Sequence, residues 1–451
     1  MKNKIFLYIT TISLVLTMTA CSSEEENIFD QSAAERLNSV SATYSGRLTN
    51  SKGGWVMEYY PYIDNDDPVT GVGYLIMNRY NSNGSVYTMM KNKATNNTKW
   101  DDTSAWEIIT DMGPVLTYNT WNKCYGRFTD PVDIDMTTGR SDDESGKGFQ
   151  GDYEFVMVDV PEGGDHIMLK GKKRGIYQRL TRLPEGTDFE AYLDDIDAFK
   201  SKIFISGAKW EIFMNDHSKR YRINNISKGL PTIYPDGMDS TAYGWHMPYM
   251  ITKSNGNYYL RYKESVKKDD YNMEQEFVYN ASDDKFHGVV DSNNIIEGGD
   301  PYDFFASVLE NGGSRWEWDA DSEMSDSYKT VFSAVVDDFK NILTYPLTST
   351  SLRVNGGQLF LRFTYKQGKN NHNIDYVFEM HRNDGKVEFK FVKDNDTTAK
   401  NARTKLPNIQ VLIDLLQQNW IPGASGSLFD LSMLKLVSSN DSNMWFLVTL
   451  K

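Results

Sequence analysis

The stretch "GYLIMNRYNSNGSVYTMM", residues 73–90, contains two runs rich in apolar and aromatic residues, separated by Asn83-Gly84. Runs of this composition are typical of β-strands. An Asn-Gly pair supplies the positive φ angles that a tight hairpin turn requires. The stretch therefore predicts a β-hairpin and places antiparallel strands in the N-terminal part of the chain.

Further strand patterns lie on both sides of this hairpin. Trp55, Met57 and Tyr59 alternate with Val56 and Glu58, as on a strand with one buried face. Other strands are expected in "PVLTY" (114–118), "YEFVMVDV" (153–160) and "HIMLKG" (166–171). Residues 29–185 are therefore predicted to form an N-terminal antiparallel β domain built as a meander. The triplet Gly53-x-Trp55 also resembles the first-strand signature of lipocalin-like barrels, although one triplet leaves barrel closure open.

Helices are expected at both ends of this first domain. Residues 30–48 have a helical apolar spacing behind Asp30, which can cap the free backbone N–H groups. In "TDFEAYLDDIDAFK" (187–200), Thr187 and Glu190 match a capping box. The apolar face of this second helix consists of Phe189, Leu193, Ile196 and Phe199. Residues 186–204 are predicted to be a linking helix, with a domain boundary near residue 204.

Residues 205–451 are predicted to form a C-terminal β-rich domain with helices. Strands are expected in "KWEIF" (209–213), "NYYLRYK" (257–263), "LFLRFTY" (359–365), "IDYVFEMH" (374–381), "VEFKFV" (387–392) and "MWFLVTL" (444–450). Hairpin turns are expected at Asn255-Gly256 and Asp384-Gly385. Helical faces are expected from Phe305, Val308 and Leu309 behind Asp300-Pro301, from Val331, Val335, Phe339 and Ile342, and from Ile409, Leu412, Ile413 and Leu416. The predicted fold class is mainly β with several helices, α+β.

A tryptophan begins the first expected strand of each half. Trp55 follows Gly53-Gly54, and Trp210 follows Gly207-Ala208-Lys209. This repetition raises the hypothesis of a duplicated architecture. Short glycine–tryptophan combinations also arise by chance in a chain with 33 glycines and 10 tryptophans, so the hypothesis stays open.

The N-terminus has the pattern of an export signal. Lys2 and Lys4 precede an uncharged run, Ile5 to Ala20, which is short for a membrane-spanning helix. Thr19-Ala20-Cys21 resembles the lipobox of bacterial lipoproteins, in which the cysteine is lipidated. We therefore expect a lipoprotein signal peptide at residues 1–20 and lipidation of Cys21. The alternative is a secreted protein in which Cys21 is incidental.

The acidic residues after the cysteine indicate a location. "SSEEE" (22–26) resembles the surface-export signal of Bacteroidetes lipoproteins. We expect residues 21–28 to be a lipidated acidic tether and the protein to be an outer membrane lipoprotein exposed at the cell surface. A solvated tether that faces the periplasm is the alternative.

Five motifs after the tether are shared with one family. They are "FDQSAAERL", "GGWVMEYYP", "GPVLTYNTWN", "GDYEFVM" and "LKGKKRG", spread over residues 28–175. In them the chain resembles the domain-of-unknown-function 4302 family of Bacteroidetes lipoproteins. Tyr118, Asn119 and Trp121 stand where that family more often has Phe, Asp and Tyr. The resemblance implies an outer-membrane lipoprotein of a glycan- or nutrient-scavenging lineage and transfers no catalytic residue.

The net charge bears on nucleic-acid binding, and the number of cysteines bears on disulfide formation. The formal net charge is −14, and no basic cluster is dense enough to follow a phosphate backbone, so no nucleic acid partner is expected. Cys21 and Cys124 are the two cysteines of the chain. With Cys21 lipidated, no intramolecular disulfide is expected and Cys124 is predicted to be a buried side chain.

The sequence lacks the common catalytic motifs. The six histidines form no H-E-x-x-H pattern, and neither a G-x-S-x-G elbow nor a phosphate-binding loop occurs. Glu317 stands between two tryptophans, but on a strand it would point away from both and into solvent. Asp319, Asp321 and Glu323 resemble the start of a Ca²⁺ loop that then departs from the EF-hand pattern. The acid-rich segment "DPVDIDMTTGRSDDES" (130–145) offers carboxylates without a recognised spacing. No cofactor is expected, and a structural Ca²⁺ is the alternative.

Aromatic residues are the remaining candidates for ligand binding. "YGWHMPYM" (243–250) combines Trp245, His246 and Tyr249, which we single out as candidate ligand-binding residues, since sugar rings stack on aromatic faces. Packing in a β core is the competing interpretation. The favoured hypothesis is a non-catalytic surface protein that binds glycan, peptide or nutrient fragments for an outer-membrane transporter system. An adhesion or assembly component and a carboxylate-based hydrolase are the alternatives.

Overall fold

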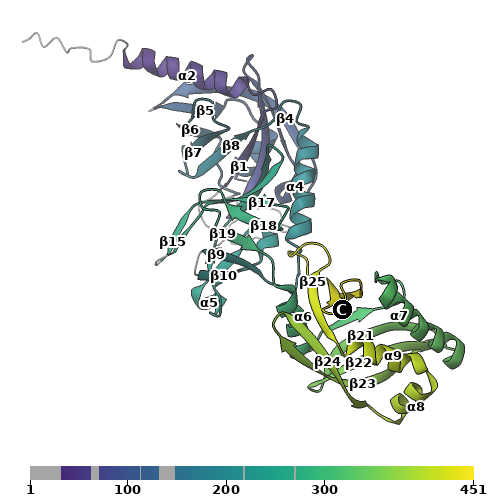
Figure 1. Ribbon diagram of the computed structural model, residues 1–451. Helices are drawn as coiled ribbons and strands as arrows, with labels where there is room; N and C mark the ends of the chain where they lie inside the picture. Colours follow the sequence, from purple (N-terminus) through teal and green to yellow (C-terminus); the bar gives the residue numbers. More distant parts are fainter. Residues whose placement is uncertain (1–31, 62–70, 112, 132–147, 217–218, 269–270) are drawn as a thin grey trace, which may run out of the picture.

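The computed structural model describes residues 32–61, 71–111, 113–131, 148–216, 219–268 and 271–451 (Figure 1). Along the chain these residues form an eight-stranded closed barrel, a nine-stranded sheet and a second eight-stranded closed barrel. Helices lie before, between and beside the sheets. The predicted fold class, mainly β with several helices, is confirmed.

The first barrel is an antiparallel meander in which each strand pairs with the next and β1 pairs with β8 to close the ring. Its strands are β1 (Trp55–Tyr59), β2 (Tyr74–Tyr80), β3 (Ser85–Met90), β4 (Trp100–Thr110), β5 (Pro114–Tyr118), β6 (Glu154–Asp159), β7 (His166–Gly171) and β8 (Tyr177–Arg182). The hairpin predicted around residue 84 joins β2 to β3, and Gly84 has a φ of 79°. The expected meander is therefore present, and it closes.

Strand β1 is buried on both faces, which the alternating pattern did not predict. Trp55, Met57 and Tyr59 point into the barrel core. Val56 packs outside the barrel against α4 (Phe189–Ile203), and Glu58 is covered by the nine-stranded sheet. The outer face of β1 is thus an interface between parts of the chain, not a solvated surface.

A short helix, α3 (Lys123–Thr129), contributes side chains to the interior of the first barrel. Tyr125 and Phe128 are almost fully buried and pack on Tyr59. The hydroxyl of Tyr125 lies 2.6 Å from that of Tyr118 and donates to Asn78 at 3.0 Å. The neighbouring Cys124 is buried, as predicted. The barrel centre is therefore filled by aromatic rings and a satisfied polar cluster.

The nine-stranded antiparallel sheet follows the linking helix. Its strand order is β12-β11-β10-β9-β19-β18-β17-β14-β13. The strands are β9 (Ile212–Asp216), β10 (Lys219–Asn224), β11 (Thr232–Pro235), β12 (Trp245–His246), β13 (Tyr249–Ser254), β14 (Asn257–Tyr262), β17 (Glu276–Asn280), β18 (Lys285–Gly288) and β19 (Asn294–Glu297). A separate hairpin, β15 (Val266–Lys268) and β16 (Tyr271–Met273), and two short helices, η4 (Ile226–Lys228) and α5 (Ser240–Tyr243), complete this region.

The second barrel repeats the closed meander of the first, with β20 paired to β27. Its strands are β20 (Arg315–Trp318), β21 (Leu347–Asn355), β22 (Gln358–Gln367), β23 (Asn370–Asn383), β24 (Lys386–Asp394), β25 (Asn419–Ala424), β26 (Met433–Ser438) and β27 (Trp445–Leu450). Its helices are α6 (Pro301–Asn311), α7 (Asp326–Asp338) with the π-helical turn η5 (Phe339–Leu343), α8 (Thr397–Lys405) and α9 (Pro407–Leu416). Residues 205–451 therefore contain an open nine-stranded sheet, a two-stranded hairpin and a closed barrel.

The two barrels share an indole contact at the first strand. Trp55 Nε1 donates to the Leu48 carbonyl of α2 (Ala33–Thr49) at 3.0 Å, and Trp316 Nε1 donates to the Phe305 carbonyl of α6 at 3.1 Å. Both indoles are fully buried. Trp316, and not Trp210, is thus the counterpart of Trp55, because Trp210 lies before β9 in the open sheet. The recurring unit is a helix followed by a closed meander.

Several helix ends differ from the sequence patterns. Ser32, not Asp30, caps α2 and forms a capping box with Glu35. Asp188, not Thr187, caps α4, because the Thr187 hydroxyl donates to the Pro184 carbonyl instead. The predicted apolar faces of α4, α6 and α9 are buried. On the face expected from Val331, Val335, Phe339 and Ile342, the last residue is half exposed, because α7 widens into the π-helical turn η5 before Ile342.

No helix within the described part of the chain is both long enough and apolar enough to cross a membrane.

Candidate functional site

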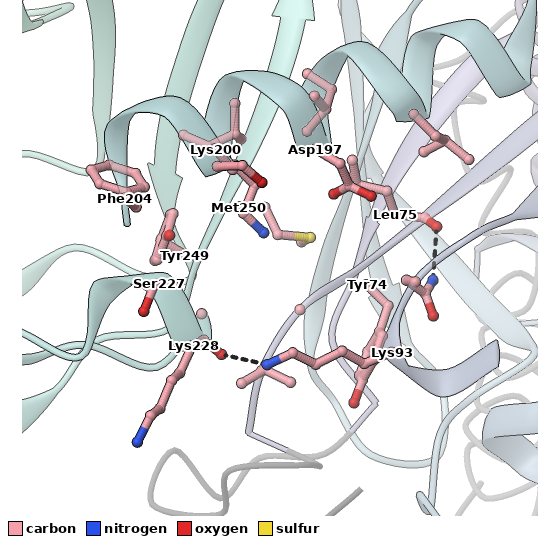
Figure 2. Close-up of a pocket in the computed structure, with 18 of the residues that line it drawn as sticks. Tyr74, Leu75, Lys93, Asp197, Lys200, Phe204, Ser227, Lys228, Tyr249 and Met250 are labelled. Atoms are coloured by element: carbon pink, nitrogen blue, oxygen red, sulfur yellow. Dashed lines mark hydrogen bonds between the residues drawn. The ribbon is translucent and has the colours of Figure 1, made fainter. Parts of the chain in front are cut away.

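A cavity of about 520 Å³ lies where the first barrel, helix α4 and the nine-stranded sheet meet (Figure 2). Its walls come from the start of β2, the segment between β3 and β4, one face of α4, η4 and the start of β13. Ligand cavities commonly lie at such junctions and span roughly 300–1,000 Å³. The size and the position therefore fit a small-molecule site.

Lysines dominate the charged lining of this cavity. Lys91, Lys93, Lys200 and Lys228 line it together with one acid, Asp197. We call it the lysine pocket. The Lys91 ammonium forms an ion pair with the carboxylate of Asp194 at 2.5 Å. Asp194 itself does not line the cavity. In a chain with a formal net charge of −14, this concentration of basic residues runs against the overall charge.

Two of these ammonium groups face each other across the pocket. Lys200 and Asp197 project from α4 toward Lys93 and Lys228 (Figure 2). Lys93 Nζ donates to the carbonyl of Lys228 at 3.3 Å. Among the described residues, none forms a hydrogen bond or an ion pair with the ammonium of Lys200. The Lys200 ammonium therefore lines the pocket without a counter-ion among the described residues.

The electrostatics of the pocket disfavour its own positive charges. Burial, and then the charge of Lys93, lower the pKa of Lys200, while Asp197 acts in the opposite direction. Burial, and then the charge of Lys228, lower the pKa of Lys93. Loss of solvent raises the pKa of Asp197. A bound anion would offset the repulsion between the lysines and raise the pKa of both.

The rest of the wall combines aromatic and apolar side chains with several asparagines and serines. Tyr74, Phe204, Tyr249 and Met250 line the pocket beside the lysines. The Tyr249 hydroxyl donates to the Ile226 carbonyl at 2.7 Å, so this hydroxyl already has a hydrogen-bond partner within the protein. An apolar wall with a few convergent charges is the usual composition of a small-molecule site.

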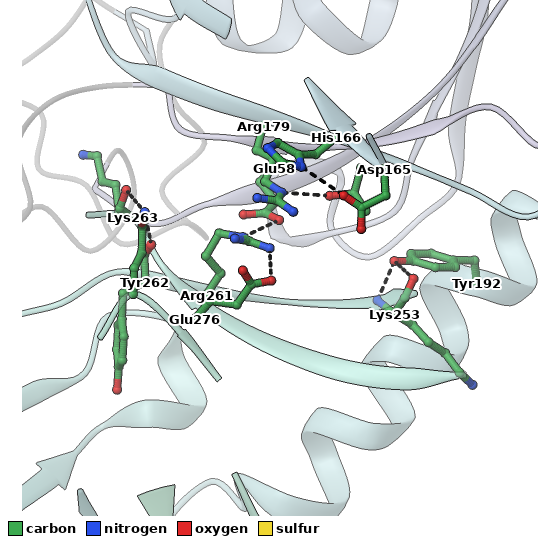
Figure 3. A network of polar contacts seen from close by, with 12 residues as sticks. Glu58, Asp165, His166, Arg179, Tyr192, Lys253, Arg261, Tyr262, Lys263 and Glu276 are labelled. Atoms are coloured by element: carbon green, nitrogen blue, oxygen red, sulfur yellow. Dashed lines mark hydrogen bonds and ion pairs between the residues drawn. The ribbon is translucent and has the colours of Figure 1, made fainter. Parts of the chain in front are cut away.

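Buried polar contacts hold the walls of the pocket together (Figure 3). Arg261 of β14 donates from Nε to Glu58 of β1 at 3.1 Å and also pairs with Glu276. Glu58 is 2% exposed and the Arg261 side chain 10%. Tyr192 of α4 bonds to the backbone of Lys253 on β13, with its hydroxyl 2.7 Å from the amide nitrogen. The barrel, α4 and the sheet therefore form one preorganised site.

The family comparison covers this whole site. A model described as "Domain of unknown function (DUF4302)" matches residues 25–281, more than half of the chain. The chain belongs to the DUF4302 family. In this DUF4302 protein the match includes the first barrel and every residue of the lysine pocket, whereas the second barrel lies beyond it.

The other comparisons add no relative from which function can be argued. No curated protein matches this DUF4302 chain. Among solved structures, the β chain of DNA polymerase III from Streptococcus pneumoniae TIGR4 aligns at 8% identity over 91% of this chain and 97% of that chain, with a TM-score of 0.13. A transferrin-binding protein B mutant from Haemophilus parasuis Hp5 aligns at 9% identity over 88% and 74%, with a TM-score of 0.14. Scores this low establish no shared fold.

The structure separates the three aromatic candidates of the sequence analysis. Tyr249 lines the lysine pocket. Trp245 and His246 form the edge strand β12 and lie outside that lining. Trp245 is half-buried and packs edge-to-face on Tyr221, with ring centroids 5.7 Å apart. "YGWHMPYM" therefore does not present its aromatics as one surface.

The acidic candidates have local structural partners. Glu317 points away from the buried Trp316 and Trp318, as predicted, and pairs with Arg315 at 2.8 Å. Asp319 accepts the backbone N–H of Asp321 at 3.0 Å within a turn. Within the described ranges, no group of three or more His, Cys, Asp or Glu is placed to hold a metal ion. Most of the acidic segment at 130–145 lies outside the described residues.

The lysine pocket was not recognised from the sequence. Its cations come from three separate segments, around residues 91–93, 200 and 228. The one local signal is "KNK" (91–93) in an otherwise acidic chain. That signal is common on solvated loops, so only the tertiary contacts give it meaning.

Proposed function

We propose that this DUF4302 protein is a non-catalytic binding protein for glycan or nutrient fragments, and that the lysine pocket takes an anionic group of the ligand. The observation that carries the proposal is the Lys200 ammonium, which lines a pocket of ligand size and faces Lys93 with no ion pair of its own among the described residues. A carboxylate, sulfate or phosphate would form charge-assisted hydrogen bonds with these lysines.

The remaining lining supports a ring-bearing ligand rather than a bare ion. Tyr74, Phe204 and Met250 provide apolar surface next to the cations. A fragment with one acidic group and one apolar or CH-rich face would use both parts of the wall. An acidic sugar has this combination, and so does an aromatic acid.

The proposal is tested by calorimetric titration of the chain from residue 28 onward with inorganic sulfate, trigalacturonic acid and neutral maltotriose. Lys200→Met keeps an unbranched side chain of nearly the same length and removes its charge. A hydrogen bond to a charged group contributes about 1.5–3 kcal/mol, so we expect this variant to bind the two anions roughly 10- to 100-fold more weakly.

Lys202→Met is the matched control, because Lys202 is an exposed residue near the end of the same helix and does not line the pocket. It should bind like the parent. Equal weakening in both variants, or a preference for maltotriose that Lys200→Met does not alter, contradicts the anion site. Release of reducing sugar from trigalacturonic acid or maltotriose on incubation with the protein would contradict the non-catalytic proposal.

We also propose that a lipid on Cys21 holds the protein at the outer membrane, with the acidic tether directing it to the cell surface, where an outer-membrane transporter would receive the captured fragment. This proposal rests on the lipobox-like Thr19-Ala20-Cys21 and on "SSEEE" (22–26). Labelling with an alkyne-tagged fatty acid should mark the parent and not Cys21→Ser. Protease treatment of intact cells should degrade the parent, and its survival would favour the periplasm-facing alternative.

A further inference from the structure

A second cavity, of about 430 Å³, lies at the opposite junction, where the nine-stranded sheet meets the second barrel. It is formed by the start of β9, by β10 and by helix α6. Trp210, Glu211, Arg220, Asp236, Phe304 and Asn311 are among its lining residues. We call it the tryptophan pocket. The family match ends at residue 281, so part of this lining lies beyond it.

The indole of Trp210 is held at its edge. Its Nε1 donates to the Phe429 carbonyl at 2.9 Å. The ring of Phe304 packs edge-to-face on it, with centroids 6.1 Å apart and an angle of 80° between the planes. Trp210 remains only half-buried and lines the cavity. A ligand that stacks on this ring would not have to immobilise it first, which reduces the entropic cost of binding.

Planar polar groups line the same cavity as this aromatic residue. Arg222 pairs with both Glu211 and Asp236 and so fixes two carboxylates on one wall. The Arg220 guanidinium stacks on Phe213, 3.5 Å from the ring centroid, and approaches Asp236 only at 4.0 Å. Arginine has five donors in a fixed plane, and each carboxylate accepts at two oxygens. Several of these hydrogen-bond donors and acceptors remain for the hydroxyl groups of a ligand.

The charge of this lining differs from that of the lysine pocket. Three basic residues, Lys209, Arg220 and Arg222, are set against four acidic residues, Glu211, Asp236, Asp300 and Asp303. The lysine pocket has four lysines and one aspartate. The near balance of charge, with many donors and acceptors beside an aromatic ring, favours a neutral ligand rich in hydroxyl groups.

We propose that the tryptophan pocket binds a pyranose ring of a neutral saccharide, with the ring stacked on Trp210 and its hydroxyl groups hydrogen-bonded to Arg220, Glu211 and Asp236. This site is chemically distinct from the anion site and does not depend on it. A chain with both sites would hold a saccharide at one junction of the nine-stranded sheet and an acidic group at the other.

The test is calorimetric titration of the chain from residue 28 onward with cellotetraose, xylotetraose, mannotetraose and maltotetraose. We expect saturable binding of at least one of them, weakened about tenfold or more in Trp210→Ala and in Arg220→Ala. If Trp210→Ala does not fold, Arg220→Ala decides, because that side chain is exposed. The matched aromatic control is Trp121→Ala, since Trp121 is 62% exposed and lines neither pocket.

Lys200→Met should bind the tetrasaccharide like the parent, which separates failure of this site from failure of the anion site. The proposal is overturned if none of the four saccharides binds, if both pocket variants bind like the parent, or if Trp121→Ala is weakened as much as they are.

Discussion

The buried ion pair between Glu58 and Arg261 should contribute strongly to the stability of the junction between the first barrel and the nine-stranded sheet. Glu58 is 2% exposed, and Arg261 bonds to it at 3.1 Å while also pairing with Glu276. Arg179 lies in the same network, where burial and then the charge of Arg261 lower its pKa. Removing the Glu58 carboxylate would leave the buried Arg261 and the half-buried Arg179 with fewer counter-charges.

The magnitude follows from this geometry. Removal of one partner of a buried pair typically costs about 3–5 kcal/mol. Because Arg261 keeps Glu276, we expect Glu58→Gln to lower the free energy of unfolding by about 3 kcal/mol, the lower end of that range. The double variant Glu58→Gln/Arg261→Gln should cost less than the sum of the single variants, since the Glu58–Arg261 attraction is lost only once and neither member of that pair remains charged.

The assay is urea unfolding followed by tryptophan fluorescence, with amide hydrogen exchange in β1 and β14 to locate the loss. Glu185→Gln is the matched control, because the Lys52–Glu185 pair has side chains 74% and 71% exposed and should contribute less than about 1 kcal/mol. A Glu58→Gln variant within about 1 kcal/mol of the parent would refute the inference that this pair stabilises the junction.

Three further predictions concern other parts of the molecule. Sulfate affinity should fall from neutral to alkaline pH, because burial holds the pKa of Lys200 below its ordinary value. Binding should also take up protons, since a bound anion raises that pKa. A sulfate affinity that does not change with pH in calorimetric titrations would contradict this prediction. Phe429→Ala should cost about 3–5 kcal/mol in urea unfolding, since this fully buried ring from the second barrel lies in the core of the nine-stranded sheet. Gly53→Ala should cost about 1–3 kcal/mol, because its Cβ would lie 1.9 Å from the Pro184 carbonyl oxygen, whereas Gly46→Ala within α2 should be neutral or stabilising.

Local chemistry predicted most of the strand and helix elements correctly. The turns at Asn255-Gly256 and Asp384-Gly385 have positive φ at both residues, as the tight hairpins require. The helix behind Asp300-Pro301 is capped by the Asp300 carboxylate and ends at Gly312. These features depend on neighbours in the chain, so a sequence pattern identifies them.

Long-range packing decided where the patterns misled. Val56 and Glu58 alternate with the barrel-facing residues of β1, which suggests a solvated face, yet α4 and the nine-stranded sheet cover both. Trp210 resembled the first-strand tryptophan of a second half, but Trp316 occupies that place. A single residue type recurs too often to indicate which strand closes which barrel.

The two pockets show the same limit at the level of function. More than a hundred residues separate Lys93 from Lys200 and Lys228 in the sequence. The spacing of these three lysines matches no ligand-binding motif. Their proximity arises because α4 lies between the first barrel and the nine-stranded sheet. The aromatic segment at 243–250 had the composition of a binding surface, but the sheet uses Trp245 for packing.

Hydrophobic periodicity and turn residues therefore establish that this chain is mainly β with helices, because those signals act over a few neighbouring residues. Closure of the meanders into two barrels depends on pairing between β1 and β8 and between β20 and β27, more than a hundred residues apart in the chain. The lysine and tryptophan pockets form only where these closed units meet the open sheet. Long-range contacts, which no local pattern encodes, determine both the closure and the candidate sites.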